Sequence, residues 1–200
     1  MTRVYLFRHG EVELARTRRF IGHLDVPLSP HGERQCAAQA ERLRGAAVAA
    51  VFTSDLVRAR RSGEIIAAPH GLSPSLVPAL REMAMGRWEG LTGDEIRARE
   101  PEAFDDWMGR IGEFPFPEGE SLPDLVARAW PAFQDLVAAH GGGAIAIVAH
   151  GGTNRALLCR ALGLPLGRLL VFGQDYGALS VLEHDSEGWR LARLNECPVP

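Results

Sequence analysis

Three short apolar segments, each followed by a helical pattern, constrain what this chain can fold into more than any other feature of its sequence. The segments span residues 3–7, 48–52 and 144–149, and each has the length and apolar character of a buried strand. Strands that alternate with helices are typical of α/β folds, in which helices cover both faces of a sheet. We therefore predict a three-layer α/β/α sandwich with a mostly parallel central sheet.

Boundary signals place the helices between these strands. Ser29 and Pro30 have the residue types preferred at an N-cap and at a first helical position, which predicts a helix over residues 30–44. Ser54 is expected to cap a second helix from about residue 55 to residue 68. The remaining predicted elements are helices over 121–140 and 153–162 and a terminal hairpin that pairs 179–183 with 189–194.

The middle of the chain lacks such a regular pattern. Residues 79–119 contain several prolines and tryptophans, with one weak helical stretch near 92–108. A chain of 200 residues fits one domain. We predict a single domain over residues 1–200, in which about residues 83–119 form an inserted lid lobe.

The charge composition excludes several functions. All 22 basic residues are arginine, so there is no Schiff-base lysine and no lysine for a Walker-type phosphate loop. Any bound phosphate must then rely on arginine and on backbone N–H groups. The net charge of −3 gives no electrostatic footprint for nucleic acid or for an anionic membrane.

Cysteine usage and hydropathy indicate the compartment. Cys36, Cys159 and Cys197 are widely spaced and form no CxxC pair, which fits a reducing environment better than a disulfide framework or a zinc site. The N-terminus lacks the apolar stretch of a signal peptide, and no segment approaches the roughly 20 apolar residues of a membrane helix. We expect a cytoplasmic protein.

Two histidines and two arginines are expected to meet at one edge of the sheet. Ligands of open α/β sheets bind beyond the carboxyl ends of the strands, and there the sequence places Arg8, His9, Arg58 and His150. The helix after Gly152 would direct free N–H groups at an anion. This set favours a phosphoryl group over a zinc ion. One neutral imidazole could attack phosphorus if a backbone carbonyl held its other nitrogen as a donor.

Four motifs in order resemble the histidine phosphatase (phosphoglycerate mutase-like) superfamily, and the resemblance extends from residue 3 to about residue 180. They are Arg8-His9-Gly10-Glu11 with Gly22-His23-Leu24-Asp25 and Pro27-Leu28-Ser29, then Ser54-Asp55-Leu56-Val57-Arg58-Ala59, then Leu80-Arg81-Glu82 with Gly86-Arg87-Trp88-Glu89-Gly90, and last Ala149-His150-Gly151-Gly152.

The resemblance implies a role for each matching residue. His9 would be the nucleophile and Glu82 the proton donor, while Arg8, Arg58 and His150 would hold the phosphoryl oxygens. The residues alone leave Glu11 and Glu89 open as the acid. We also place Gly22, Gly151 and Gln174 among the phosphate-binding residues. The family uses no metal and no other cofactor, and it permits a homodimer.

The expected substrate is a small phosphorylated metabolite. Residues 20–29 and 174–177 are similar to those of alpha-ribazole phosphatases, which implies alpha-ribazole 5′-phosphate and a place in cobalamin synthesis. Two departures weaken any assignment of substrate: the family often has Thr or Ser at position 12 and Asn at position 15, where this chain has Val12 and Ala15. Thr153, Gln174 or water could supply the lost hydrogen bonds.

Three other functions stay open. A phosphoglycerate mutase would return the phosphoryl group to a second hydroxyl, although residues 90–121 are short for the insertion of the family's mutases. A non-catalytic phosphate-binding module would explain the polar residues lost at Val12 and Ala15. A zinc hydrolase is the weakest alternative, because no HExxH-like spacing is present.

Overall fold

The computed structural model describes residues 1–198, and its central feature is one six-stranded sheet with the order β3-β2-β4-β1-β5-β6. The pairs β3–β2, β2–β4 and β4–β1 are parallel, whereas β5 runs antiparallel to β1 and β6 antiparallel to β5. The strands span β1 Thr2–Arg8, β2 Val48–Thr53, β3 Ser75–Leu76, β4 Ala144–Ala149, β5 Leu179–Asp185 and β6 Gly188–Glu196.

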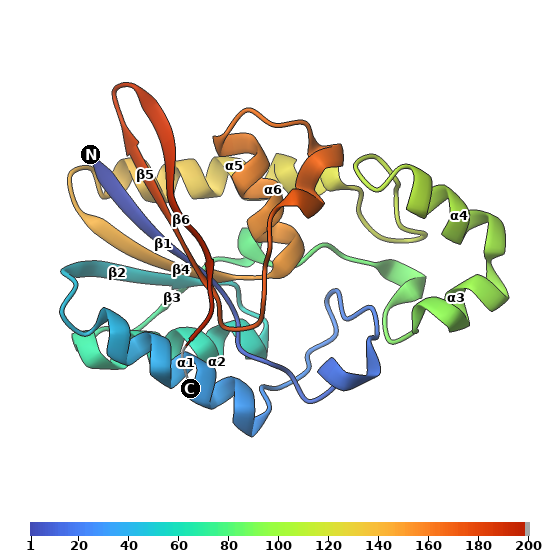
Figure 1. The fold of residues 1–200 in the computed structure, drawn as a ribbon, viewed down its shortest axis with the longest axis horizontal. Helices are drawn as coiled ribbons and strands as arrows, with labels where there is room; N and C mark the ends of the chain where they lie inside the picture. The colour runs from blue at the N-terminus through green and yellow to red at the C-terminus, as the bar shows by residue number, and fades with distance from the viewer. Residues whose placement is uncertain (199–200) are drawn as a thin grey trace.

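Helices cover both faces of this sheet (Figure 1). They span α1 Pro30–Leu43, α2 Val57–Ala67, α3 Gly93–Arg99, α4 Pro101–Gly109, α5 Leu122–Ala139 and α6 Gly151–Ala161, with short 3-10 turns at Ala15–Thr17 (η1), Ala68–His70 (η2), Pro78–Leu80 (η3), Gly86–Trp88 (η4) and Leu166–Val171 (η5). Helices α1 and α2 lie on one side, and α5 and α6 on the other. The predicted α/β/α sandwich with a mostly parallel sheet is confirmed.

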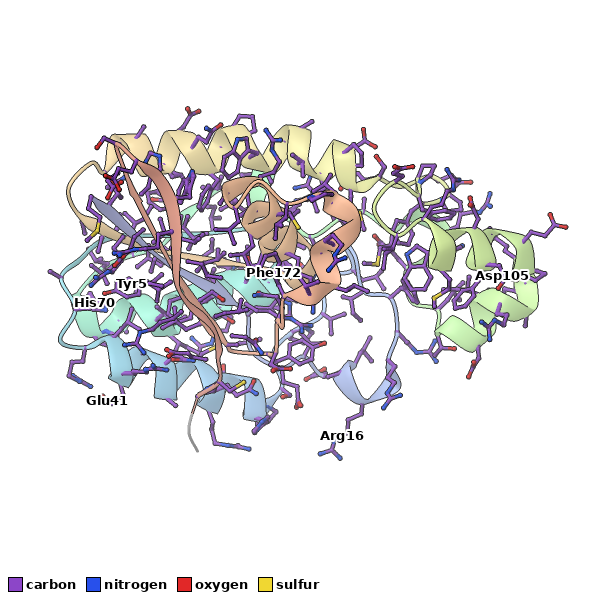
Figure 2. All side chains as sticks on the ribbon, turned by 45° about the horizontal axis from the view of Figure 1, so that its top comes forward. Tyr5, Arg16, Glu41, His70, Asp105 and Phe172 are labelled. Carbon is purple, nitrogen blue, oxygen red and sulfur yellow. The ribbon has the colours of Figure 1, made fainter. Side chains whose placement is uncertain are left out.

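The alternation of side chains along β4 explains the two faces. Ile145 and Ile147 point into the cluster that packs under α5 and α6, while Ala146 and Val148 point into the cluster under α1 and α2. Successive residues of a strand face opposite sides of the sheet, and a strand covered on both sides is apolar throughout. All four of these side chains are fully buried. Figure 2 shows that charged side chains such as Arg16 and Glu41 project from the periphery.

Most predicted elements are present, with two corrections at helix starts. Ser29 caps α1 by accepting a hydrogen bond from Gly32 N–H, as expected. The expected Ser54 cap is wrong, because α2 begins at Val57 and its first N–H donates to Asp25 Oδ1 at 2.7 Å. Helix α6 begins at Gly151, two residues before the predicted start. In both cases the residue that directly follows the strand, Ser54 after β2 and His150 after β4, belongs to the candidate site.

The middle segment, residues 83–119, lies beside the sheet layers and carries α3 and α4 (Figure 1). Where the sequence predicts one weak helical stretch over 92–108, the structure has two helices that meet at Glu100, because the residue before a proline disfavours helical geometry. The buried side chains of this segment surround Trp88, which contacts the rings of Phe104, Phe114 and Phe116. No helix within residues 1–198 is both long and apolar enough to cross a bilayer.

Candidate active site

His9 lies directly after β1, at the carboxyl edge of the sheet. His9 is 5% exposed, and its Nδ1 lies 2.7 Å from the carbonyl oxygen of Gly10. A carbonyl can only accept, so Nδ1 carries the proton and Nε2 keeps its lone pair. Burial, with the nearby charges of Arg58 and Arg8, holds the pKa of His9 well below its ordinary value. The imidazole is therefore neutral at pH 7, and a backbone carbonyl orients it as the sequence predicted.

Arg58 reaches the same site from the first turn of α2. Its side chain is buried, and its two terminal nitrogens donate to the carbonyls of Gly22 at 2.6 Å and Leu24 at 2.7 Å. Gly22 has φ +49°, and a Cβ there would lie 2.2 Å from Glu89 Oε1, so only glycine fits this turn. Gly22 thus positions Arg58 through its carbonyl oxygen.

Arg8, the last residue of β1, is fixed from a different part of the chain. One terminal nitrogen donates to the carbonyl of Gln174 at 2.5 Å, and the guanidinium carbon lies 3.7 Å above the ring centre of Tyr176. Its Nε is buried and has no partner among the described residues. Both arginines therefore present a fixed guanidinium group at the pocket, and an oxyanion would satisfy the donors that the protein leaves free.

His150 occupies the N-cap position of α6 and is fully buried. Its ring meets that of His9 edge-on, with 5.1 Å between the ring centres. Nε2 lies 2.6 Å from Ser54 Oγ, and Nδ1 is a buried polar atom without a partner among residues 1–198. Burial, followed by the charge of Arg58, keeps the pKa of His150 well below its ordinary value. The position leaves one ring nitrogen available for a ligand.

Glu82 places its carboxylate at the start of α6. Oε2 accepts from the N–H of Gly152 at 2.9 Å, and Oε1 accepts from the N–H groups of Thr153 at 3.1 Å and Met83 at 3.0 Å. The expected anion site at this helix end is thus already occupied by a carboxylate of the chain itself. The N–H of Gly151, the first residue of α6, has no partner among the described residues.

The segment that carries Glu82 is held by α5. Arg128 donates to the carbonyls of Ala79, Arg81 and Glu82 at 2.7, 3.0 and 2.8 Å. On the opposite side, Nε2 of His23 lies 2.7 Å from the carbonyl oxygen of Glu82 and donates to it. The backbone of Glu82 is therefore anchored independently of its carboxylate.

The two other candidate acids lie elsewhere. Glu11 Oε1 accepts from the hydroxyl of Ser29 at 2.9 Å, at the start of α1. Glu89 Oε1 accepts from the N–H groups of His23 at 2.8 Å and Met85 at 3.0 Å. Only Glu82 supplies a carboxylate to the lining of the pocket that contains His9, Arg8 and Arg58.

The structure places Gln174 differently from the prediction. Its side chain points into the interior, where Oε1 accepts from Asn154 Nδ2 at 2.9 Å, and only its carbonyl serves the site, by holding Arg8. Thr153 is also occupied, because its hydroxyl donates to the carbonyl of Arg81 at 2.9 Å. Neither residue replaces the polar groups missing at Val12 and Ala15. Val12 lines the pocket with an apolar side chain.

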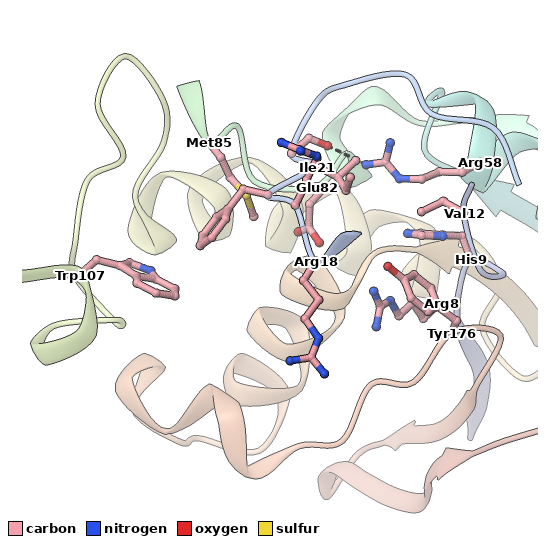
Figure 3. A pocket seen from close by; sticks show the side chains of 13 residues that line it. Arg8, His9, Val12, Arg18, Ile21, Arg58, Glu82, Met85, Trp107 and Tyr176 are labelled. Carbon is pink, nitrogen blue, oxygen red and sulfur yellow. Dashed lines mark hydrogen bonds between the residues drawn. The ribbon is translucent and has the colours of Figure 1, made fainter. Parts of the chain in front are cut away.

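The pocket itself is a cavity of about 340 Å³, within the range of roughly 300–1,000 Å³ that small-molecule sites occupy. Figure 3 shows its lining, with Arg8, His9, Arg58 and Tyr176 at one end and Trp107 and Met85 at the other. Residues that the sequence analysis missed are Tyr176, Arg18, Arg19, Phe20, Ile21, Met85 and Trp107. Residues 174–177 resemble alpha-ribazole phosphatases, but of these only Gln174 is predicted to bind phosphate. Within residues 1–198, no group of three or more His, Cys, Asp or Glu side chains is arranged to hold a metal ion.

Comparisons with known proteins identify a family. The model described as histidine phosphatase superfamily (branch 1) matches residues 4–197. A protein of Serratia proteamaculans named probable phosphoglycerate mutase is 33% identical over 189 residues, which cover 94% of this chain and 88% of that protein. A mycobacterial glucosyl-3-phosphoglycerate phosphatase, solved with VO3, is 30% identical with a TM-score of 0.86 over 97% of this chain and 99% of that one. The alpha-ribazole phosphatase of Shigella flexneri is 25% identical with a TM-score of 0.90 over 97% and 96%.

Proposed function

This chain belongs to the histidine phosphatase superfamily, as its four motifs predicted, and we propose that it hydrolyses a small phosphate monoester through a phosphohistidine at His9. The observation that carries the proposal is the hydrogen bond from His9 Nδ1 to the carbonyl of Gly10. It leaves the lone pair of Nε2 free, in a cavity that also contains two guanidinium groups and one carboxylate. A nucleophile, charge neutralisation and an acid are the groups that phosphoryl transfer needs.

In the first step, His9 Nε2 forms a bond to phosphorus while the bond from phosphorus to the ester oxygen breaks. Glu82 enters this step as the carboxylic acid and gives its proton to that leaving oxygen, so the alcohol departs neutral. Arg8 and Arg58 neutralise the charge on the phosphoryl oxygens, and His150 donates from Nδ1 when the Ser54 hydroxyl donates to Nε2. His9 Nδ1 keeps its proton throughout and donates it in a hydrogen bond to the Gly10 carbonyl.

In the second step, water replaces the alcohol. The Glu82 carboxylate takes a proton from the water as its oxygen attacks phosphorus, and the bond between Nε2 and phosphorus breaks. Inorganic phosphate leaves, His9 regains its lone pair, and Glu82 is protonated again. Each group therefore ends the cycle in its starting state.

Two kinds of relative support different substrates. Likeness to the alpha-ribazole phosphatase of Shigella flexneri supports alpha-ribazole 5′-phosphate and cobalamin synthesis. Likeness to the mycobacterial glucosyl-3-phosphoglycerate phosphatase supports an ester of phosphoglycerate type. A screen that includes both kinds of ester, read out as released inorganic phosphate, tests which kind this pocket accepts.

Phosphoglycerate mutase activity is the second candidate, because the Serratia proteamaculans relative carries that name. Incubation with 3-phosphoglycerate separates the two. Release of inorganic phosphate supports hydrolysis, whereas net conversion to 2-phosphoglycerate without release would replace the proposal with a mutase.

The proposed reaction itself is tested with p-nitrophenyl phosphate. We expect steady turnover by the wild-type chain and no turnover above background by His9→Ala. Absence of turnover by the wild-type chain on p-nitrophenyl phosphate and on the screened esters would leave the non-catalytic phosphate-binding module as the better description.

A further inference from the structure

The pocket holds more positive charge than one phosphoryl group requires. Four arginines line it, and Arg8 and Arg58 lie beside His9, where the phosphoryl group would bind. Arg19 is neutralised by Glu95, whose Oε2 lies 2.9 Å from its terminal nitrogen. Arg18 has neither an ion pair nor a side-chain hydrogen bond among the described residues. One guanidinium group at the pocket is thus left without a counter-charge.

The backbone of Arg18 holds it in an unusual conformation. Arg18 ends the η1 turn with φ 49° and ψ 40°, in the left-handed region. This conformation costs a non-glycine residue about 1–2 kcal/mol. Its N–H donates to the carbonyl of Ala15 at 3.4 Å, which closes the turn. In Figure 3 its side chain lies between Trp107 and the pair formed by Arg8 and Tyr176.

The surroundings of Arg18 fit a substrate that carries a second acidic group. The only acidic side chain in the lining is Glu82, and backbone N–H groups of α6 already hold its carboxylate. Phe20, Met85 and Trp107 supply an apolar wall to the same cavity. Arg18 is itself exposed, so a ligand that fills this cavity must cover its guanidinium group before water screens their contact less. A single free guanidinium matches a carboxylate in charge and fork geometry, whereas a second phosphate carries about −1.5 to −2 charges.

We propose that Arg18 determines specificity by binding a carboxylate on the alcohol portion of the substrate, outside the phosphoryl site. This inference rests on the proposed phosphatase function and narrows its substrate to acidic phosphate monoesters. It disfavours alpha-ribazole 5′-phosphate, whose nucleoside portion carries no carboxylate.

Calorimetric binding to the full chain with His9→Ala tests the inference without turnover. The two ligands are 3-phosphoglycerate and glycerol 3-phosphate, which differ by a carboxylate in place of a hydroxymethyl group. We expect the former to bind at least about tenfold more tightly at physiological ionic strength, where exposed charges beyond about 8 Å are screened. Adding Arg18→Gln should reduce this preference to about twofold or less, and Arg18→Lys should retain part of it.

Arg16→Gln is the matched control. Arg16 lies on the same turn and is exposed, as Arg18 is, but it projects away from the molecule in Figure 2 and does not line the pocket. Arg16→Gln removes the same charge as Arg18→Gln, but outside the pocket. The preference for 3-phosphoglycerate should therefore persist in Arg16→Gln. Equal affinity of the two ligands, no detectable binding of either, or equal loss of preference in Arg16→Gln and Arg18→Gln would overturn the inference. Turnover of p-nitrophenyl phosphate by the wild-type chain decides the proposed function separately.

Discussion

The carboxylate of Glu82 accepts a hydrogen bond from the N–H of Gly152 at 2.9 Å, so the first turn of α6 positions the proposed proton donor. A Cβ on residue 152 would lie 2.5 Å from Glu82 Oε1 and 3.2 Å from its Cδ. Real Cβ atoms essentially never come within 3.0 Å of another heavy atom, so a methyl group there must displace the carboxylate. The position of the Glu82 carboxylate therefore requires glycine at residue 152.

Gly152→Ala should impair catalysis while leaving the fold intact. Because the methyl group displaces the acid, we expect turnover of alkyl phosphates to fall about a hundredfold or more, and that of p-nitrophenyl phosphate to fall less. Glu82→Gln should show the same dependence on the leaving group. Alanine favours a helix by up to about 1 kcal/mol over glycine, so the free energy of unfolding should change by no more than that. Steady-state kinetics and urea unfolding measure the two effects.

Gly45→Ala is the control for that substitution, since a Cβ at residue 45 meets no atom within 4 Å. It should leave turnover within about twofold of wild type. Equal slowing of good and poor leaving groups in Gly152→Ala would argue against Glu82 as the proton donor.

Ser54→Ala should reveal whether Ser54 orients His150. The Ser54 hydroxyl lies 2.6 Å from His150 Nε2, and its loss leaves that buried nitrogen without a partner. We expect kcat to fall roughly tenfold, which corresponds to about 1.4 kcal/mol, with little change in KM. Nitrogen NMR of His150 should show the proton on Nδ1 in the wild-type chain and a mixture of tautomers in the variant.

Thr53→Val controls for removal of a neighbouring hydroxyl. The Thr53 hydroxyl is buried but has no hydrogen-bond partner in the described part of the chain. Its removal should leave kcat unchanged within about twofold. A wild-type chain with the His150 proton on Nε2 would contradict the assigned role of Ser54.

Arg58→Lys should not be a conservative change. Arg58 uses both terminal nitrogens to bridge the carbonyls of Gly22 and Leu24, and an ammonium group cannot bridge two carbonyls and also bind a phosphoryl oxygen in the same plane. We expect kcat/KM to fall by about 10²–10³-fold, the range seen when one preorganised donor is lost. Arg60→Lys, at an exposed position on the same helix, should change it by less than about twofold. Retention of activity in Arg58→Lys would show that Arg58 only holds the 22–24 loop.

Stability should fall as the pH drops below the ordinary pKa of histidine. The pKa values of His9 and His150 are lowered in the folded state by burial, with the charges of Arg58 and Arg8 adding to the effect, whereas the unfolded chain titrates near about 6.5. Between the folded and unfolded values the unfolded state binds more protons, so the free energy of unfolding rises with pH. Each histidine should contribute up to about 1.4 kcal/mol per pH unit below about pH 6.5, and nothing further above it.

Urea unfolding between about pH 5 and pH 8 measures this slope. His9→Asn should remove part of it, while His31→Gln, at an exposed position, should not. A slope that is unchanged in His9→Asn would show that His9 contributes nothing to the pH dependence.

The sequence predicted the fold and the inner site better than the outer pocket. Short motifs at strand ends identify His9, Arg8, Arg58 and His150, because the carboxyl ends of parallel strands meet at one edge. The family resemblance implies Glu82 as the acid, but the residues alone leave Glu11 and Glu89 open, since only three-dimensional packing shows which carboxylate lines the cavity. The residue type of Ser54 predicts a helix cap, but its hydroxyl contacts His150 Nε2 in the structure.

The outer pocket has no local signature. Arg18 and Trp107 are far apart in the sequence and lie on irregular or weakly helical segments, so no periodicity links them. The side chain of Gln174 illustrates the same limit, because its residue type suited a phosphate while its neighbours Asn154 and Ser180 draw it inward. Tertiary packing sets where such side chains point, and no local sequence pattern reveals it.

Trapping the covalent intermediate shows directly whether His9 carries the phosphoryl group. After brief mixing of the wild-type chain with a ³²P-labelled phosphate monoester, we expect a protein-bound label that survives an alkaline quench, is lost in acid, and maps to His9. An acid-stable label, or an alkali-stable label that persists in His9→Ala, would contradict it.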